Sequence, residues 1–223
     1  MDYSTRFVRG AAVAGTFYPA DARVLERNVR DMLDRVNLKS QRKARAIIAP
    51  HAGYVFSGQV AADVYRQIEG RSFHRVVILG PAHRVAFHGM AISCAQAFET
   101  PLGPVQLDRE ACEKVLDFPM VIELDDAHRE EHSLETQLPF LQMVLPNSFR
   151  IVPLVVGECS PSMVADLLDS FIDDADTLIV VSSDLSHFHD YQTAQEIDTK
   201  TSHQIEGLDR QLLRGNQACG CHP

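Results

Sequence analysis

Short runs of Val, Ile and Leu alternate along the chain with longer segments in which apolar residues recur every three or four positions. The runs are RAIIAP at 45–50, HRVVILGP at 74–81, FRIVPLVVG at 149–157 and TLIVVSSD at 177–184. Such short, uniformly apolar runs are typical of strands buried on both faces of a parallel sheet. The pattern predicts an α/β fold, a three-layer α/β/α sandwich with a mostly parallel or mixed central sheet.

Apolar residues at helical spacing, combined with capping residues, predict the helices. We expect helices over 21–36, 57–70, 133–145 and 191–213, others that begin at 108 and 160, and extended segments over 89–93 and 99–108. Ser57 is the expected N-cap of the second helix, and Pro139 is expected to kink the helix over 133–145. In the helix from 160, the residues expected to face inward are Met163, Leu167, Leu168 and Phe171.

The composition is that of a folded protein, with 45% hydrophobic and 23% charged residues in a chain of 223. No linker or repeat interrupts the pattern, so we expect one domain over 1–223. The formal net charge of -9 is spread along the chain, which argues against nucleic acid and anionic membranes as partners. No apolar run is long enough for a membrane helix, and the N-terminus lacks a signal-peptide pattern, so we expect a cytoplasmic protein.

The five cysteines are odd in number, which suits reduced thiols in the cytosol better than a disulfide framework. Cys94, Cys112 and Cys159 lie in apolar patterns and are expected to be packing residues. The terminal CGCH at 219–222 has no partner pair for a zinc ribbon, and its composition favours a frayed tail.

Histidines follow three of the four apolar runs, at the places where ligands bind in open α/β sheets. His51 follows the first run, His83 the second, and His187 the fourth, with Asp184 three residues earlier. Imidazole binds iron, copper and zinc, and a carboxylate completes the two-histidine, one-carboxylate pattern of non-haem iron sites. Any one of these histidines alone is more readily a structural residue, but together they indicate a shared site. Five other histidines, at 74, 88, 128, 189 and 203, are expected on the surface.

The segment EEHSLE at 130–135 is a second candidate for chemistry. His132 could reach the same site, with Glu131 or Glu135 as an acid, a base or a ligand; alternatively, the charges only complement a helix dipole. The sequence leaves these interpretations open. There is no serine-hydrolase elbow, no P-loop and no dinucleotide fingerprint.

Six motifs occur in one order along the chain: GTFYP, IIAPHAGYVFSG, VVILGPAH, EEHSLE, VVSSDLSH and CGCHP. In this the chain resembles the Memo family, called AmmeMemoRadiSam system protein B in prokaryotes. The resemblance implies a fold similar to that of class III extradiol dioxygenases. It also implies a pocket lined by His51, His83 and Cys219, with His132, Asp184 and His187 at pocket positions less directly tied to metal.

The resemblance further implies a mononuclear iron or copper site and metal-dependent redox or dioxygenase-like activity, with zinc as another metal to consider. We expect His51, His83 and Cys219 or Asp184 as ligands, and His132 and His187 as proton-transfer groups. The alternatives are a non-catalytic module that binds a peptide or protein, and a zinc hydrolase. The implied partners are a small-molecule or peptide ligand and radical-SAM and AMMECR1-like proteins. Because Memo proteins normally continue past the terminal His-Pro, the resemblance implies a truncated chain.

Overall fold

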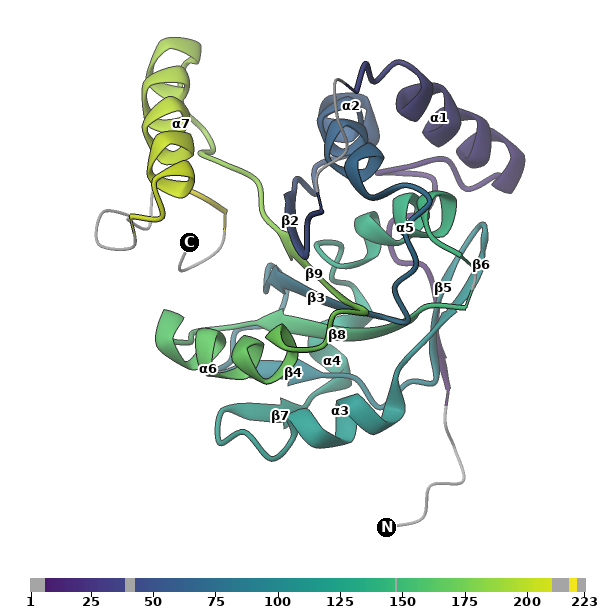
Figure 1. The fold of residues 1–223 in the computed structure, drawn as a ribbon, viewed down its shortest axis with the longest axis vertical. Coiled ribbons are helices and arrows are strands. Elements are labelled where there is room, and N and C mark those ends of the chain that lie inside the picture. The colour runs from purple at the N-terminus through teal and green to yellow at the C-terminus, as the bar shows by residue number, and fades with distance from the viewer. Residues whose placement is uncertain (1–6, 39–42, 147, 210–216, 220–223) are drawn as a thin grey trace.

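A mixed six-stranded sheet forms the centre of the fold in this computed structural model, which describes residues 7–38, 43–146, 148–209 and 217–219 (Figure 1). The strand order is β2-β9-β3-β8-β4-β7, and the only antiparallel pair in this sheet of the described chain is β4 with β8. The bounds are β2 Ala46–Ala49, β9 Thr177–Ser182, β3 Arg75–Pro81, β8 Arg150–Val156, β4 Met90–Ile92 and β7 Val121–Glu123. The four apolar runs therefore form the adjacent strands β2, β9, β3 and β8, as their composition predicts.

A second, smaller sheet has the order β1-β5-β6 and consists of β1 Val8–Arg9, β5 Ala97–Thr100 and β6 Gly103–Gln106. Strand β5 pairs with β1 in parallel and with β6 in antiparallel orientation. The turn between β5 and β6 contains Gly103 with a φ of 111°, a conformation that glycine adopts without strain. The sequence predicted the extended segment over 99–108, whereas β1 and β7 are too short to produce a hydrophobic pattern.

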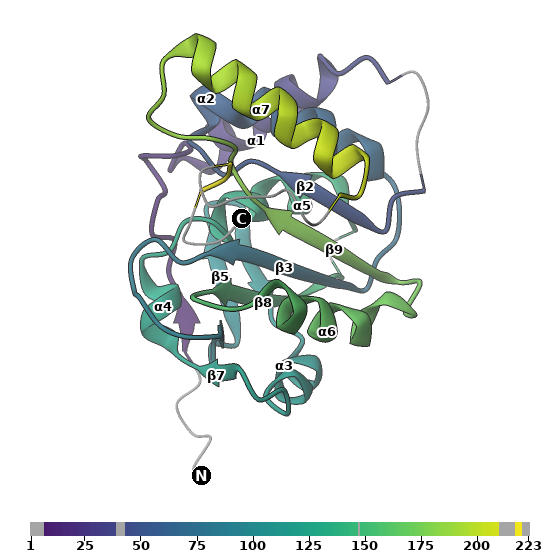
Figure 2. The ribbon, with the colours of Figure 1, turned by 90° about the vertical axis from the view of Figure 1, so that its left-hand side faces the viewer.

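Helices cover both faces of the central sheet (Figures 1 and 2). On one face lie α1 Ala22–Asp34, α2 Tyr54–Tyr65 with its 3₁₀ extension η1 Arg66–Ile68, the 3₁₀ turn η2 Glu135–Gln137, and α5 Leu138–Val144. The opposite side carries α3 Arg109–Val115 and α6 Pro161–Ile172, while α4 Asp125–Arg129 lies next to β4 and α7 Tyr191–Glu206 follows β9. This arrangement confirms the predicted α/β/α layers.

Three of the predicted helix starts are confirmed by their capping bonds. The side chain of Asp21 accepts from the Val24 amide at 3.0 Å, that of Asp108 from Ala111 at 3.1 Å, and that of Ser160 from Met163 at 3.4 Å.

The predicted start at Ser57 is wrong, because α2 begins at Tyr54 and Gly53 is its N-cap. The Ser57 hydroxyl instead donates to the Ala52 carbonyl at 3.1 Å. Tyr54 is buried and donates from its hydroxyl to the Thr136 carbonyl at 2.7 Å. This tertiary anchor outweighs the modest capping preference of a serine.

The segment over 133–145 also differs from the prediction. It forms the 3₁₀ turn η2 and then α5, so Pro139 lies in the first turn of α5 rather than at a kink within one helix. A proline costs little there because the first amides of a helix have no partner within it.

The inward face of α6 is only partly as predicted. Leu167 and Phe171 are buried and Leu168 is partly buried, but Met163 is exposed because it lies on the outer side of the first turn. The last predicted helix is confirmed over 191–206, and its predicted continuation over 210–213 lies outside the described residues.

The core lies around β3, β8 and β9, whose apolar side chains are buried on both faces of the sheet. Cys112 and Cys159 are buried in it and Cys94 is half-buried; these and Cys219, the cysteines within the described ranges, are all free thiols. No helix in the described part of the chain is both long and apolar enough to cross a membrane.

Candidate metal centre

The carboxyl ends of β2, β9 and β3 converge on one site. His51 comes two residues after β2 and His83 two residues after β3, and their rings lie edge to face with centroids 5.2 Å apart. Strand β9 lies between β2 and β3 in the sheet, so its terminal residue Ser182 is placed between the two bends. The two histidines therefore meet across β9, as the rule for parallel strand ends predicts.

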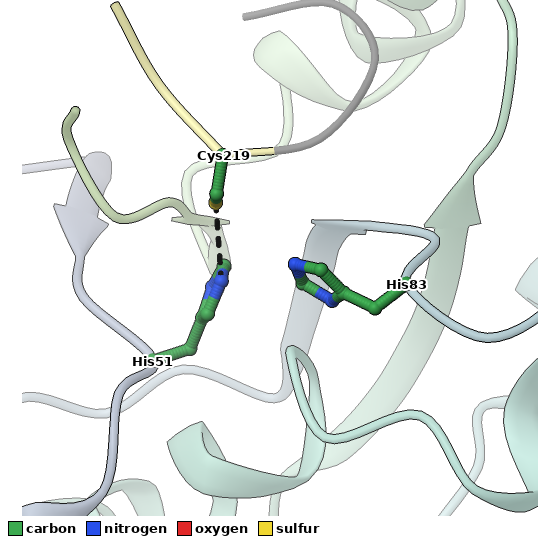
Figure 3. Close-up of side chains that lie close together, drawn as sticks. All are labelled: His51, His83 and Cys219. Carbon is green, nitrogen blue, oxygen red and sulfur yellow. Dashed lines mark hydrogen bonds between the residues drawn. The ribbon is translucent and has the colours of Figure 1, made fainter. Parts of the chain in front are cut away.

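Cys219 completes a group of three ligand atoms. One side-chain atom each from His51, His83 and Cys219 lies within 4.8 Å of the others, and Cys219 Sγ is 3.2 Å from His51 Nε2 (Figure 3). The backbone holds the cysteine in place, because its amide donates to the Asp184 carbonyl at 3.2 Å and the Asp184 amide donates to Sγ at 3.3 Å. The thiol of Cys219 thus belongs to the site and not to a frayed tail.

Hydrogen bonds at Ser182 determine which nitrogen of His51 faces the site. The Ser182 hydroxyl has one proton, which it donates to the Ser133 carbonyl at 2.5 Å. Its oxygen accepts from the side-chain amide nitrogen of Gln137 at 2.8 Å. His51 Nδ1, 2.9 Å from the same oxygen, must therefore be the donor. Nε2 is therefore the ring nitrogen that faces Cys219.

His83 is oriented in the same way by a carboxylate. Its Nδ1 lies 2.8 Å from Glu131 Oε1, and its backbone amide donates to Glu131 Oε2 at 2.6 Å. The Glu131 carboxylate also accepts from the amides of His132 and Ser133 at 2.9 and 3.0 Å. Burial raises the pKa of Glu131, but these hydrogen bonds outweigh burial and lower the pKa to about 2. A carboxylate on Nδ1 is the usual outer partner of a metal-binding histidine and leaves Nε2 free.

Cys219 and His83 carry opposite charges within the site. Burial raises the pKa of Cys219, but hydrogen bonds with His51 and His83 outweigh it and lower the pKa to about 6. Burial lowers the pKa of His83, but its hydrogen bonds with Cys219 and Glu131 raise it to about 9. Near neutral pH the site therefore contains a thiolate beside an imidazolium.

His132 forms a wall of the same site. Its ring stacks on that of His83, with centroids 4.6 Å apart. The ring centroids of Phe17 and His51 lie 4.6 and 5.5 Å from that of His132. Burial, together with the nearby positive charge of His83, lowers the pKa of His132 to about 4, so the ring is neutral at pH 7. His83, Glu131 and His132 form a second group of close ligand atoms that shares His83 with the first.

Comparisons with known proteins show the family of this chain. The model of the family described as Memo-like protein matches residues 9–216. The chain belongs to the Memo family. A MEMO1 family protein of Aquifex aeolicus is 40% identical over 206 residues, which cover 91% of this chain and 75% of the relative. A MEMO1 family protein of Ignicoccus hospitalis is 38% identical over 224 residues, which cover 93% of this chain and 78% of the relative. Another, from Nitrosopumilus maritimus, is 32% identical over 211 residues, with coverage of 91% and 77%.

The ligand set of this Memo-family chain fits a metal ion. Ser182 and Glu131 occupy the outer nitrogens of the two histidines, and both Nε2 atoms and the Cys219 sulfur remain for a common ligand. Two imidazoles and a thiolate suit copper, iron and zinc. The residues therefore fit the group that the family resemblance implies.

Asp184 and His187 lie at the edge of this group, and neither belongs to a metal-ligand cluster among the described residues. Asp184 Oδ1 accepts from the amides of His51 and Ala52 at 2.7 and 3.3 Å, so the carboxylate shapes the bend that carries His51. Its Oδ2 lies 3.8 Å from His51 Nε2 and 3.7 Å from His187 Nε2. The side chain of His187 is 41% exposed and connects this edge to solvent.

Sequence reasoning missed several supporting residues. Ser182 is the last residue of β9, and no pattern in the sequence indicates that it binds His51. His128, expected on the surface, is buried at 2% exposure and lies 3.0 Å from the Ala91 carbonyl through Nε2, because α4 packs against β4. The surface prediction is confirmed for His74, His88, His189 and His203, which are exposed.

Glu135 has a structural position. It is fully buried and its carboxylate binds Arg9, the Tyr18 hydroxyl, and the amides of Ala12 and Val13 at 2.8 and 3.0 Å. These bonds attach the N-terminal segment to η2. Of the two acids considered in EEHSLE, Glu131 therefore contacts the candidate ligands and Glu135 supports the segment behind them.

Proposed function

We propose that this Memo-family protein binds one redox-active metal ion, iron or copper, through His51, His83 and Cys219, and acts on a small molecule at that centre. The observation that carries the proposal is the convergence of three ligand atoms within 4.8 Å, two of them imidazole nitrogens freed by outer hydrogen bonds. An iron or copper ion held there would supply electron transfer and a Lewis acid. Zinc would supply only the Lewis acid.

The chain's own residues have distinct roles in this proposal. Glu131 and Ser182 hold the two histidines, and Asp184 holds the bend at His51 through two backbone amides. His132 is stacked on His83 at the wall of the centre and is the proposed proton-transfer group for a ligand bound there. His187 lies next to Asp184 at the exposed edge and is the proposed proton-transfer group on that side of the centre. The free thiols of the described chain suit a reducing compartment, and we propose a cytoplasmic location.

Elemental analysis of anaerobically purified protein tests the site. Wild-type protein is expected to contain stoichiometric iron or copper, and His51→Ala and His83→Ala are expected to lose it. His88→Ala is the matched control, because His88 is exposed and pairs only with Glu158 at 3.0 Å among the described residues. No stoichiometric metal under any loading condition would overturn the proposal and leave the non-catalytic peptide- or protein-binding module.

Oxygen consumption tests the redox part. Metal-loaded wild-type protein is mixed with a panel of catechols and other small reductants, and uptake is followed with an oxygen electrode. Uptake that disappears in His83→Ala supports a dioxygenase-like or oxidase activity. If the bound metal is zinc and no uptake occurs, the redox function is refuted and a zinc hydrolase takes its place.

A further inference from the structure

A cavity of about 210 Å³ lies beside Cys219, at the carboxyl ends of β3, β8 and β9 and against α6. We call it the α6 cavity. Its apolar walls are formed by side chains from those four elements: Leu79, Val156, Val164, Leu168 and Val181. Apart from the Cys219 thiolate, which belongs to the candidate metal centre, none of the described residues that line it carries a charge. It therefore differs from the metal-ligand cluster next to it, which consists of titratable groups.

The α6 cavity is continuous with the candidate metal centre. Cys219 and Ser182 line it, and both contact His51, at 3.2 and 2.9 Å respectively. Ser182 offers no free hydrogen bond to a ligand, because its hydroxyl already donates to Ser133 and accepts from Gln137 and His51. The second cysteine in the wall, Cys159, is a free, buried thiol. A ligand in the cavity would thus meet apolar surface on most sides and the metal centre at one end.

A second cavity lies on the side of His83. It has a volume of about 640 Å³, includes the polar side chains of His83, Arg84 and Glu158 among apolar ones, and shares Val156 and Gly157 with the α6 cavity. The two cavities are therefore neighbours at the end of β8.

We propose that the α6 cavity binds the uncharged, apolar part of the substrate, a group about the size of one aromatic ring, whose polar end meets the metal centre. This inference rests on the proposed function of that centre and adds the substrate class. The volume supports it, since an apolar protein cavity of about 150 Å³ accommodates benzene. The lining excludes a charged group, because burying an ion without a partner costs several kcal/mol, about the free energy of binding a small ring.

Fluorobenzene is a suitable probe, observed by its ¹⁹F NMR signal in titrations with the full chain. Val164→Trp places a large side chain in the cavity, whereas Met163→Trp adds the same side chain at the neighbouring exposed position of α6. We expect wild type and Met163→Trp to bind fluorobenzene equally and Val164→Trp to bind it at least about tenfold more weakly. Equal binding by wild type and Val164→Trp would overturn the inference.

Copper(II) tests the link to the metal centre, because an unpaired electron broadens the ¹⁹F signal of a ligand bound next to it. We expect broadening in copper-loaded wild type and none in His51→Ala. Fluorobenzene that binds without broadening in copper-loaded protein would refute the placement next to the centre, while leaving the metal site itself intact.

A separate measurement covers the case in which no metal binds and the proposed function fails. Fluorobenzene should still slow the modification of Cys159 by methyl methanethiosulfonate, because both occupy the same cavity. Slower modification would support binding of an apolar ligand in the α6 cavity, and an unchanged rate would refute it.

Discussion

At the scale of single residues, one hydroxyl group determines how His51 can bind a metal. Ser182 donates its only proton to Ser133, so its oxygen must accept from His51 Nδ1. The metal-facing nitrogen is then Nε2, which lies beside Cys219. Without this acceptor the imidazole could turn or change tautomer, and either change would move the lone pair away from the other ligands.

Ser182→Ala should therefore weaken iron or copper binding by at least about tenfold while the protein remains folded, because outer partners of ligand histidines typically contribute this much. Competition with a chelator of known affinity measures the change, and circular dichroism checks the fold. Gln137 keeps its hydrogen bond to the Pro50 carbonyl at 3.0 Å, which limits the structural damage.

Ser183→Ala is the matched control, since the Ser183 hydroxyl donates only to the Asp184 carbonyl, at 3.0 Å, among the bonds of the described chain. The control should bind metal as wild type does. If both serine variants bind metal equally well, Ser182 does not position His51.

At the scale of elements, Glu135 connects β1 and the GTFYP segment to the η2 turn behind the site. Its carboxylate is fully buried and receives bonds from Arg9, Tyr18, Ala12 and Val13. The same segment places Phe17 against His132. The stability of the N-terminal segment and the position of one wall of the metal centre thus depend on the same buried ion pair.

Glu135→Gln should reduce the free energy of unfolding by about 3 kcal/mol or more, because it leaves the buried guanidinium of Arg9 without a charged partner. Urea denaturation measures the loss. Glu110→Gln removes an exposed pair with Lys114 on α3 and should leave the free energy of unfolding close to that of wild type, because solvent screens exposed pairs. Similar losses in the two variants would contradict the structural role of Glu135.

At the scale of the whole molecule, His128 connects the two sheets. From α4 it contacts the Ala91 carbonyl of β4 through Nε2 and packs edge to face on Phe98 of β5, with centroids 5.7 Å apart. Its own carbonyl accepts from Arg9 of β1 at 2.9 Å. Burial lowers the pKa of His128 to about 4, so the ring stays neutral in the folded protein well below the pH at which it is protonated in the unfolded chain.

This difference makes the stability of the protein depend on pH. Between about pH 6.5 and pH 4 the unfolded chain binds a proton at His128 that the folded protein does not, so stability falls as the pH falls through this range. The stability that depends on a neutral His128 is fully present above about pH 6.5. The free energy of unfolding should fall by about 2 kcal/mol between pH 7.5 and pH 5. Urea denaturation at the two pH values measures this change.

His128→Gln should remove that part of the pH dependence, since glutamine does not titrate. His88→Gln is the control because His88 is exposed, and it should show the same loss between pH 7.5 and pH 5 as wild type. An identical pH dependence for wild type and His128→Gln would show that burial of this ring is not its cause.

The sequence by itself determined the local features. Uniformly apolar runs identified the four adjacent strands of the central sheet, and the caps at Asp21, Asp108 and Ser160 located helix starts, because these signals depend on neighbouring residues. The position of His51 and His83 directly after two such runs was enough to expect them at one site, since parallel strands end at the same edge of a sheet.

Only the tertiary structure decided the features that depend on residues distant in sequence. It placed β9 between β2 and β3, brought Cys219 to within 3.2 Å of His51 across 168 positions, and buried His128 under α4. It also started α2 at Tyr54 instead of Ser57. Strand order, ring tautomers and the burial of a polar side chain follow from packing and hydrogen bonds between separate segments, and no local pattern of residues encodes them.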